Sequence, residues 1–135
     1  MSFNQMDCTQ RRWFDAIRAS LSRDLLSSTW RKKVPVGSHR VCGHCYIATE
    51  AAFHAFGRQA GFKCYVVSLG GGGTHRWLAH PETEAVIDLT YEQTQKSFNY
   101  KAGRNKTMRR GNGPNGISRR GAILLERARK IIDAA

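Results

Sequence analysis

The chain has 135 residues, of which 41% are hydrophobic, and carries 22 lysines and arginines against 10 acids, a net charge of +12. This length and composition predict a single domain, residues 1–135, with a real hydrophobic core. No apolar run approaches the roughly 20 residues that span a bilayer, and the N-terminus lacks a signal-peptide pattern. We therefore expect a cytoplasmic protein that does not enter the membrane, with no disulfide framework among its four cysteines.

The spacing of apolar residues and turn residues predicts an α+β fold. Three helices are expected from residues that recur every three or four positions, over 9–30, 45–59 and 119–133. Three short strands are expected between the second and third helices, over 62–69, 74–80 and 84–90. Their short turns favour antiparallel pairing. We expect helix 45–59 to pack on this small sheet, flanked by the N- and C-terminal helices.

Positive charge is concentrated in the two flanks of the chain. Residues 1–40 carry eight lysines and arginines against three acids, and residues 91–120 carry eight against one, whereas residues 41–90 are nearly neutral. Residues 91–117 are expected to form a basic irregular loop, in which aromatic residues alternate with five candidate anion-binding residues: Lys101, Arg104, Lys106, Arg109 and Arg110. Such a segment can bind a phosphate backbone and stack on bases through Phe98 and Tyr100. A solvated basic surface explains the same charges equally well.

The segment VCGHCYIATEAAFHAFG, residues 41–57, contains a candidate catalytic cysteine. Cys45 opens the second predicted helix, where the positive end of the helix dipole and a nearby imidazole would make its thiol nucleophilic. His75 would act as base and then as acid, and Asp88 would orient its imidazole. Trp77 shares a strand face with His75 and can shield it from water.

Other interpretations of these residues remain open. Cys45 and Cys42 are also compatible with buried core thiols or a redox pair. Zinc binding would use these two cysteines with one or two imidazoles from His39, His44 and His75, but a second ligand pair with zinc-site spacing is missing. We predict no metal and no cofactor. Cys64 is expected in the core, and His44 and His80 on the surface.

The motifs GHCYIATEAAFHAFGRQAGFKCYVVSL, THRWLAH and EAVIDLT, within residues 41–90, resemble the catalytic core of the transglutaminase-like superfamily, in the wider papain-like class of cysteine enzymes. The resemblance implies Cys45 as nucleophile, His75 as base and Asp88 as orienting acid, on a helix packed against an antiparallel sheet. It also implies a thioester intermediate that water or an amine resolves. Leu89 stands where the family often has proline. The small, basic chain is also similar to bacteriophage accessory proteins.

These observations lead to one functional prediction and one alternative. We expect a thiol-dependent hydrolase or acyltransferase that acts on an amide or peptide bond, with Gly43, Tyr46 and Trp77 binding substrate or shielding the site. Its basic flanks would recruit an acidic protein or peptide, or nucleic acid. The alternative is a basic nucleic-acid-binding or inhibitory protein in which residues 41–90 form only a scaffold.

Overall fold

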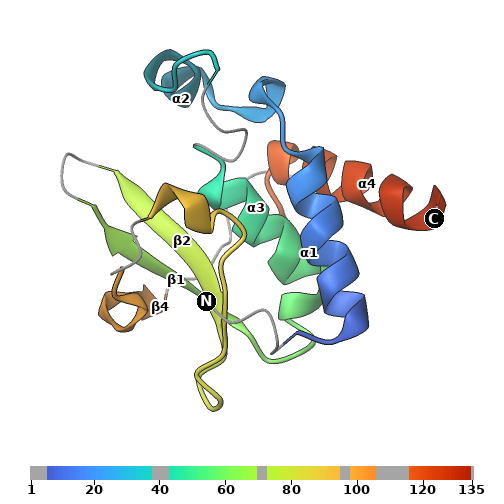
Figure 1. The fold of residues 1–135 in the computed structure, drawn as a ribbon, viewed down its shortest axis with the longest axis vertical. Coiled ribbons are helices and arrows are strands. Elements are labelled where there is room, and N and C mark those ends of the chain that lie inside the picture. Colours follow the sequence, from blue (N-terminus) through green and yellow to red (C-terminus); the bar gives the residue numbers. More distant parts are fainter. Residues whose placement is uncertain (1–5, 38–42, 70–72, 95–97, 106–115, 135) are drawn as a thin grey trace.

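The computed structural model describes five stretches of the chain, to which all structural statements refer: residues 6–37, 43–69, 73–94, 98–105 and 116–134. They form an α+β fold of four helices and one small antiparallel sheet (Figure 1). The helices are α1 (Cys8–Ser20), α2 (Ser28–Lys33), α3 (Cys45–Ala52) and α4 (Arg119–Ala134). The strands are β1 (Lys63–Ser68), β2 (Thr74–Ala79), β3 (Val86–Ile87) and β4 (Arg104–Asn105). The predicted fold class is confirmed at this level.

The sheet has the strand order β3-β2-β1-β4, and every neighbouring pair is antiparallel. In the central hairpin Val67 pairs with His75 and Tyr65 pairs with Trp77. Because side chains alternate between the faces of a strand, His75 and Trp77 lie on one face of β2 and Arg76 lies on the other. This register decides which side chains enter the site.

The core lies where α3 packs between the sheet and the other helices. Figure 1 shows α1 and α4 crossing on the side of α3 that faces away from the sheet, while α2 stands apart at one end. The small side chains of Ala48, Ala51 and Ala52 are fully buried and allow this close packing. Phe14 and Ile17 of α1 lie in the same apolar cluster, and each such buried side chain contributes about 1.5–3 kcal/mol.

The single helix predicted over residues 9–30 is wrong, because the chain breaks after α1. Leu21 has an extended backbone with ψ of 134°, and a short 3₁₀ helix, η2 (Arg23–Leu25), follows before α2. The backbone N–H of Leu21 returns to the carbonyl of Arg18 at 3.3 Å and closes the last turn of α1. The Ser27 hydroxyl accepts the backbone N–H of Trp30 at 3.2 Å and starts α2 as its N-cap. Leu25 is still buried. The apolar spacing therefore predicted correctly that Leu25 faces the core, but predicted wrongly that the helix continues to it.

The segment after β3 has more regular structure than predicted. Strand 84–90 is reduced to Val86–Ile87, after which the chain turns into the 3₁₀ helix η4 (Tyr91–Gln93). The expected irregular loop 91–117 also contains the 3₁₀ helix η5 (Tyr100–Ala102) and strand β4, whose Asn105 pairs with Tyr65. This pairing joins residues forty positions apart, so the local periodicity of the sequence does not predict it.

None of the helices in the described ranges combines the length and apolar character that a bilayer crossing requires.

Candidate active site

Cys45 is the first residue of α3, and its backbone position depends on Gly43. Gly43 has φ of 79°, and a Cβ there would lie 2.8 Å from Cδ2 of Leu26, so only glycine fits this turn. The His44 side chain does not cap the helix, which leaves the first turn of backbone N–H groups uncapped by that residue. Cys45 is 9% exposed, and its thiol donates to the carbonyl of Thr74 at 3.6 Å. The nucleophile candidate therefore sits at the positive end of a helix dipole and touches β2.

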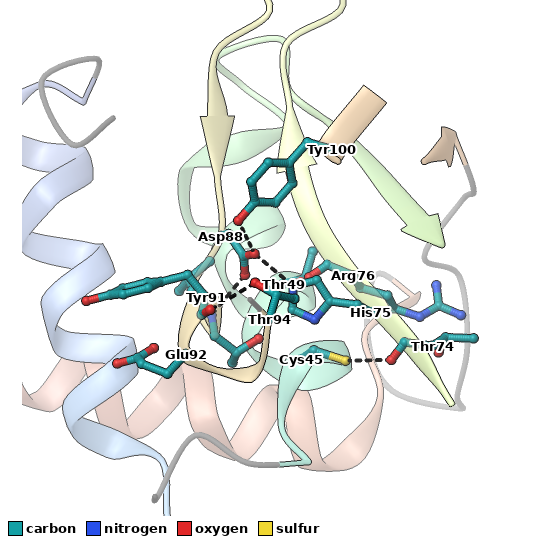
Figure 2. A network of polar contacts seen from close by, with 12 residues as sticks. Cys45, Thr49, Thr74, His75, Arg76, Asp88, Tyr91, Glu92, Thr94 and Tyr100 are labelled. Carbon is teal, nitrogen blue, oxygen red and sulfur yellow. Dashed lines mark hydrogen bonds and ion pairs between the residues drawn. The ribbon is translucent and has the colours of Figure 1, made fainter. Parts of the chain in front are cut away.

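His75 and Asp88 form a buried pair beside this thiol (Figure 2). The Nε2 atom of His75 lies 2.7 Å from Oδ2 of Asp88, and the two side chains are 1% and 0% exposed. Since Nε2 is held by the carboxylate, Nδ1 is the remaining ring nitrogen, and in Figure 2 it faces the Cys45 sulfur. The structure thus brings Cys45, His75 and Asp88 together, although they are spread over forty-four positions of the chain.

Two further donors hold the Asp88 carboxylate in place. Oδ2 also accepts the hydroxyl of Tyr100 at 2.8 Å, and Oδ1 accepts the backbone N–H of Thr90 at 3.1 Å. Burial, together with the charge and hydrogen bond of Asp88, raises the pKa of the Tyr100 hydroxyl, so Tyr100 stays a neutral donor. A buried carboxylate with three donors is compensated for its loss of water. Its orientation is fixed.

The interactions of His75 favour its protonated form. Burial alone lowers the pKa of His75, but the hydrogen bond and charge of Asp88 and the interaction with the Cys45 thiol outweigh it. Together they raise the pKa of His75 to about 9. The imidazole is therefore a cation at neutral pH, placed between a carboxylate and a sulfur.

Aromatic side chains cover the imidazole on the face of β2 that carries it. The ring of Trp77 stacks beside His75 with centroids 5.8 Å apart, and Phe98 meets His75 edge-on at 5.4 Å. Tyr100 in turn packs on Trp77 at 5.2 Å. Trp77 is fully buried, and Gly103 passes so close to its indole that a Cβ there would overlap the ring. The expected shielding by Trp77 thus has a structural counterpart, completed by residues 98–103.

A pocket of about 370 Å³ opens beside Cys45. Its walls come from α2, the start of α3, β2 and the start of α4. Of the predicted binding residues, Gly43 and Tyr46 line it. The guanidinium of Arg76 lies 4.8 Å above the centre of the Tyr46 ring. The chain therefore places a cation and an aromatic face next to the thiol.

Of the five candidate anion-binding residues, the structure describes two, and neither lines the pocket. Lys101 and Arg104 are exposed, at η5 and β4, whereas Lys106, Arg109 and Arg110 lie outside the described residues. The expectation that Phe98 and Tyr100 would stack on bases is not matched by their positions. Both rings pack against Trp77 within the protein and contact each other at 4.9 Å.

Among the histidines and cysteines outside the triad, one prediction is wrong and one is confirmed. The expectation of an exposed His44 is wrong: it is 2% exposed, and its Nε2 contacts the Ser22 carbonyl at 2.9 Å, because the turn before α3 packs under η2. Cys64 is buried as expected, and burial raises its pKa to about 12. His39 and Cys42, two of the ligands weighed for zinc, lie outside the described residues. Within the part of the chain that the structure describes, no three His, Cys, Asp or Glu side chains are grouped to hold a metal ion.

Three residues of the site were not singled out as site residues from the sequence. Arg76 carries a signal, because a cation inside the apolar strand HRWLA needs an explanation. Thr90 carries a weaker one, since threonine two residues after aspartate can donate its N–H to the carboxylate. Tyr100 carries none, because an aromatic residue in a polar segment does not reveal the carboxylate it will contact.

Comparisons with known proteins find no family model that matches the chain and no significant match among curated proteins or solved structures.

Proposed function

We propose that the protein is a thiol-dependent enzyme with a papain- or transglutaminase-like core that cleaves or transfers an amide or peptide bond through Cys45, His75 and Asp88. One observation carries the proposal. Nε2 of His75 is hydrogen-bonded to the buried carboxylate of Asp88, and Nδ1 faces the sulfur of Cys45 at the N-terminus of α3. This is the order of groups that nucleophilic catalysis by a thiol requires.

The reaction follows from the protonation state of the imidazole. A cationic His75 next to the sulfur stabilises the thiolate, which attacks the carbonyl carbon of the substrate amide. The negative charge that develops on the carbonyl oxygen meets the positive end of α3 and the backbone N–H of Cys45. His75 then gives its Nδ1 proton to the leaving amine, the C–N bond breaks, and a thioester remains on Cys45.

The second half of the reaction returns the enzyme to its starting state. Neutral His75 takes a proton from water, or from an acceptor amine, as that molecule attacks the thioester. The C–S bond breaks, the product acid or amide leaves, and the thiolate–imidazolium pair forms again. Asp88 keeps the ring in the tautomer with Nε2 protonated throughout, so Nδ1 alone exchanges the proton. Trp77 and Phe98 keep bulk water from the ring during these transfers.

The test is the rate at which a neutral alkylating reagent labels each cysteine of the full chain. With iodoacetamide at pH 7 we expect Cys45 to react at least about tenfold faster than the exposed Cys8, because only a thiolate attacks the reagent. Trypsin releases Cys42 and Cys45 in one peptide, residues 41–58, so fragment-ion spectra must separate the two. His75→Gln should slow Cys45 to the rate of Cys8 and leave Cys8 unchanged. If wild-type Cys45 reacts no faster than Cys8, the proposal is wrong.

A further inference from the structure

The pocket beside Cys45 holds a buried cation without an acidic partner. Arg76 is 7% exposed and lines the pocket, and Figure 2 shows its side chain beside Thr74, whose carbonyl accepts the Cys45 thiol. All ten acids of the chain lie in the described ranges. None of the ion pairs formed by these acids within those ranges involves Arg76.

The surroundings of Arg76 do not neutralise it. Its guanidinium lies over the ring of Tyr46, and the described residues that line the pocket include no aspartate or glutamate. The second cation of the lining, Arg120, is close enough to the buried carboxylate of Glu50 to interact with its charge. An arginine cannot relieve its burial by losing a proton, so an uncompensated guanidinium in a pocket favours the entry of an anion.

The geometry points to a substrate whose acyl group carries a carboxylate, such as a glutamyl or aspartyl residue of a peptide, with Arg76 as the residue that binds this carboxylate. The guanidinium presents two parallel N–H groups, which match the two oxygens of a carboxylate. The ring of Tyr46 lies against one side of the guanidinium. This inference rests on the proposed function, because it concerns which acyl groups reach the Cys45 thiol.

Two chloromethyl ketones of equal size test the inference on the full chain: one built on N-acetyl-glutamate and one on N-acetyl-glutamine. In each, the thiolate displaces chloride and forms a thioether, and the two reagents differ only in the charge of the side chain. We expect the glutamyl reagent to label wild-type Cys45 at least roughly tenfold faster than the glutaminyl reagent at subsaturating concentration. Arg76→Gln should reduce this ratio to about one.

A net charge of +12 attracts any anion, so the experiment needs a matched control. Lys63→Gln removes the same charge from an exposed position on β1 and should keep the wild-type preference. The preference should also persist in about 0.5 M salt, because a buried pair is screened far less than exposed charges. Should Arg76→Gln fail to fold, the wild-type ratio and its salt dependence still decide the matter, together with Arg76→Lys, which keeps the charge and should retain part of the preference.

The outcomes separate the two proposals. Fast labelling of Cys45 by both reagents at the same rate overturns the carboxylate preference and leaves the thiol enzyme in place. A preference that persists in Arg76→Gln, or that disappears in Lys63→Gln or in high salt, overturns the assignment to Arg76. If neither reagent labels Cys45 faster than Cys8, the proposed function fails, and the inference fails with it.

Discussion

Asp88→Asn keeps the shape of a buried side chain and removes the charge that holds His75 protonated. In the native protein the carboxylate accepts Nε2 of His75 at 2.7 Å, the Tyr100 hydroxyl at 2.8 Å and the Thr90 N–H at 3.1 Å. An amide has one acceptor oxygen and one NH₂ group, so at least one of these buried donors loses its partner whichever way the amide is turned. The variant therefore changes both the charge and the hydrogen bonding of the site.

The size of the effect follows from the pKa of His75, which is about 9 in the folded protein against an ordinary value of 6.5. That difference corresponds to about 3 kcal/mol. Because the folded pKa is raised, the stabilisation is fully present below pH 6.5 and is lost as the pH rises through about 9. The contribution of His75 to the free energy of unfolding should therefore fall by up to about 3 kcal/mol over that range. Asp88→Asn should remove most of this fall. At pH 6 its free energy of unfolding should be about 3–5 kcal/mol lower than that of the wild type.

Urea unfolding at a series of pH values measures these free energies, and the NMR shift of the His75 Cε1 proton measures the pKa directly. The comparison uses the difference between wild type and variant, because Cys64, whose pKa burial raises to about 12, adds a fall of the same sign above pH 9 in both proteins. A His75 that titrates near 6.5 in both proteins, or one whose pKa Asp88→Asn leaves near 9, would refute the reasoning.

Two further substitutions test the packing around the site. Gly103→Ala should destabilise the fold by about 1–3 kcal/mol and change the near-ultraviolet circular dichroism of Trp77, because the added methyl group overlaps the indole; a loss below about 0.5 kcal/mol would show that the covering segment yields freely. Glu50→Gln should stabilise the protein at neutral pH, since burial raises the pKa of Glu50 and its ionisation therefore opposes folding as the pH rises above about 4.5. The amide can keep both contacts with Ser118, and a variant that is less stable than the wild type at pH 7 would contradict this sign.

The parts of the fold that the sequence predicts are those with local patterns. The alanine-rich helix, the hairpin of β1 and β2 and the C-terminal helix each show their own periodicity within about fifteen residues. The break at Leu21 was missed, because the apolar spacing continues through buried Leu25 although the backbone has already left the helical conformation. The short length of β3 was missed for a similar reason, since Asp88 leaves the strand to accept the N–H of Thr90.

The candidate site could be predicted only where its residues carry chemistry by themselves. A cysteine at a helix start, a histidine beside tryptophan and an aspartate among apolar residues each indicate a role before any contact is known. The cover over Trp77 depends on contacts between β2 and residues 98–103, which are set by long-range packing. Sequence reasoning therefore predicted the three groups that the structure brings together and missed the aromatic residues that cover them.

The register of β2 connects the two proposals. Val67 opposite His75 and Tyr65 opposite Trp77 place the imidazole on the Asp88 side and the Arg76 guanidinium in the pocket. A shift of one residue would exchange these faces, because strand side chains alternate with a period of two. It would then bring a guanidinium to the buried carboxylate and remove the imidazole from the sulfur. Stacking of Tyr65 on Trp77 at 6.4 Å opposes that shift. The same pairing of β1 and β2 thus positions both the candidate base and the candidate substrate-binding cation. A change in this register would therefore displace both side chains.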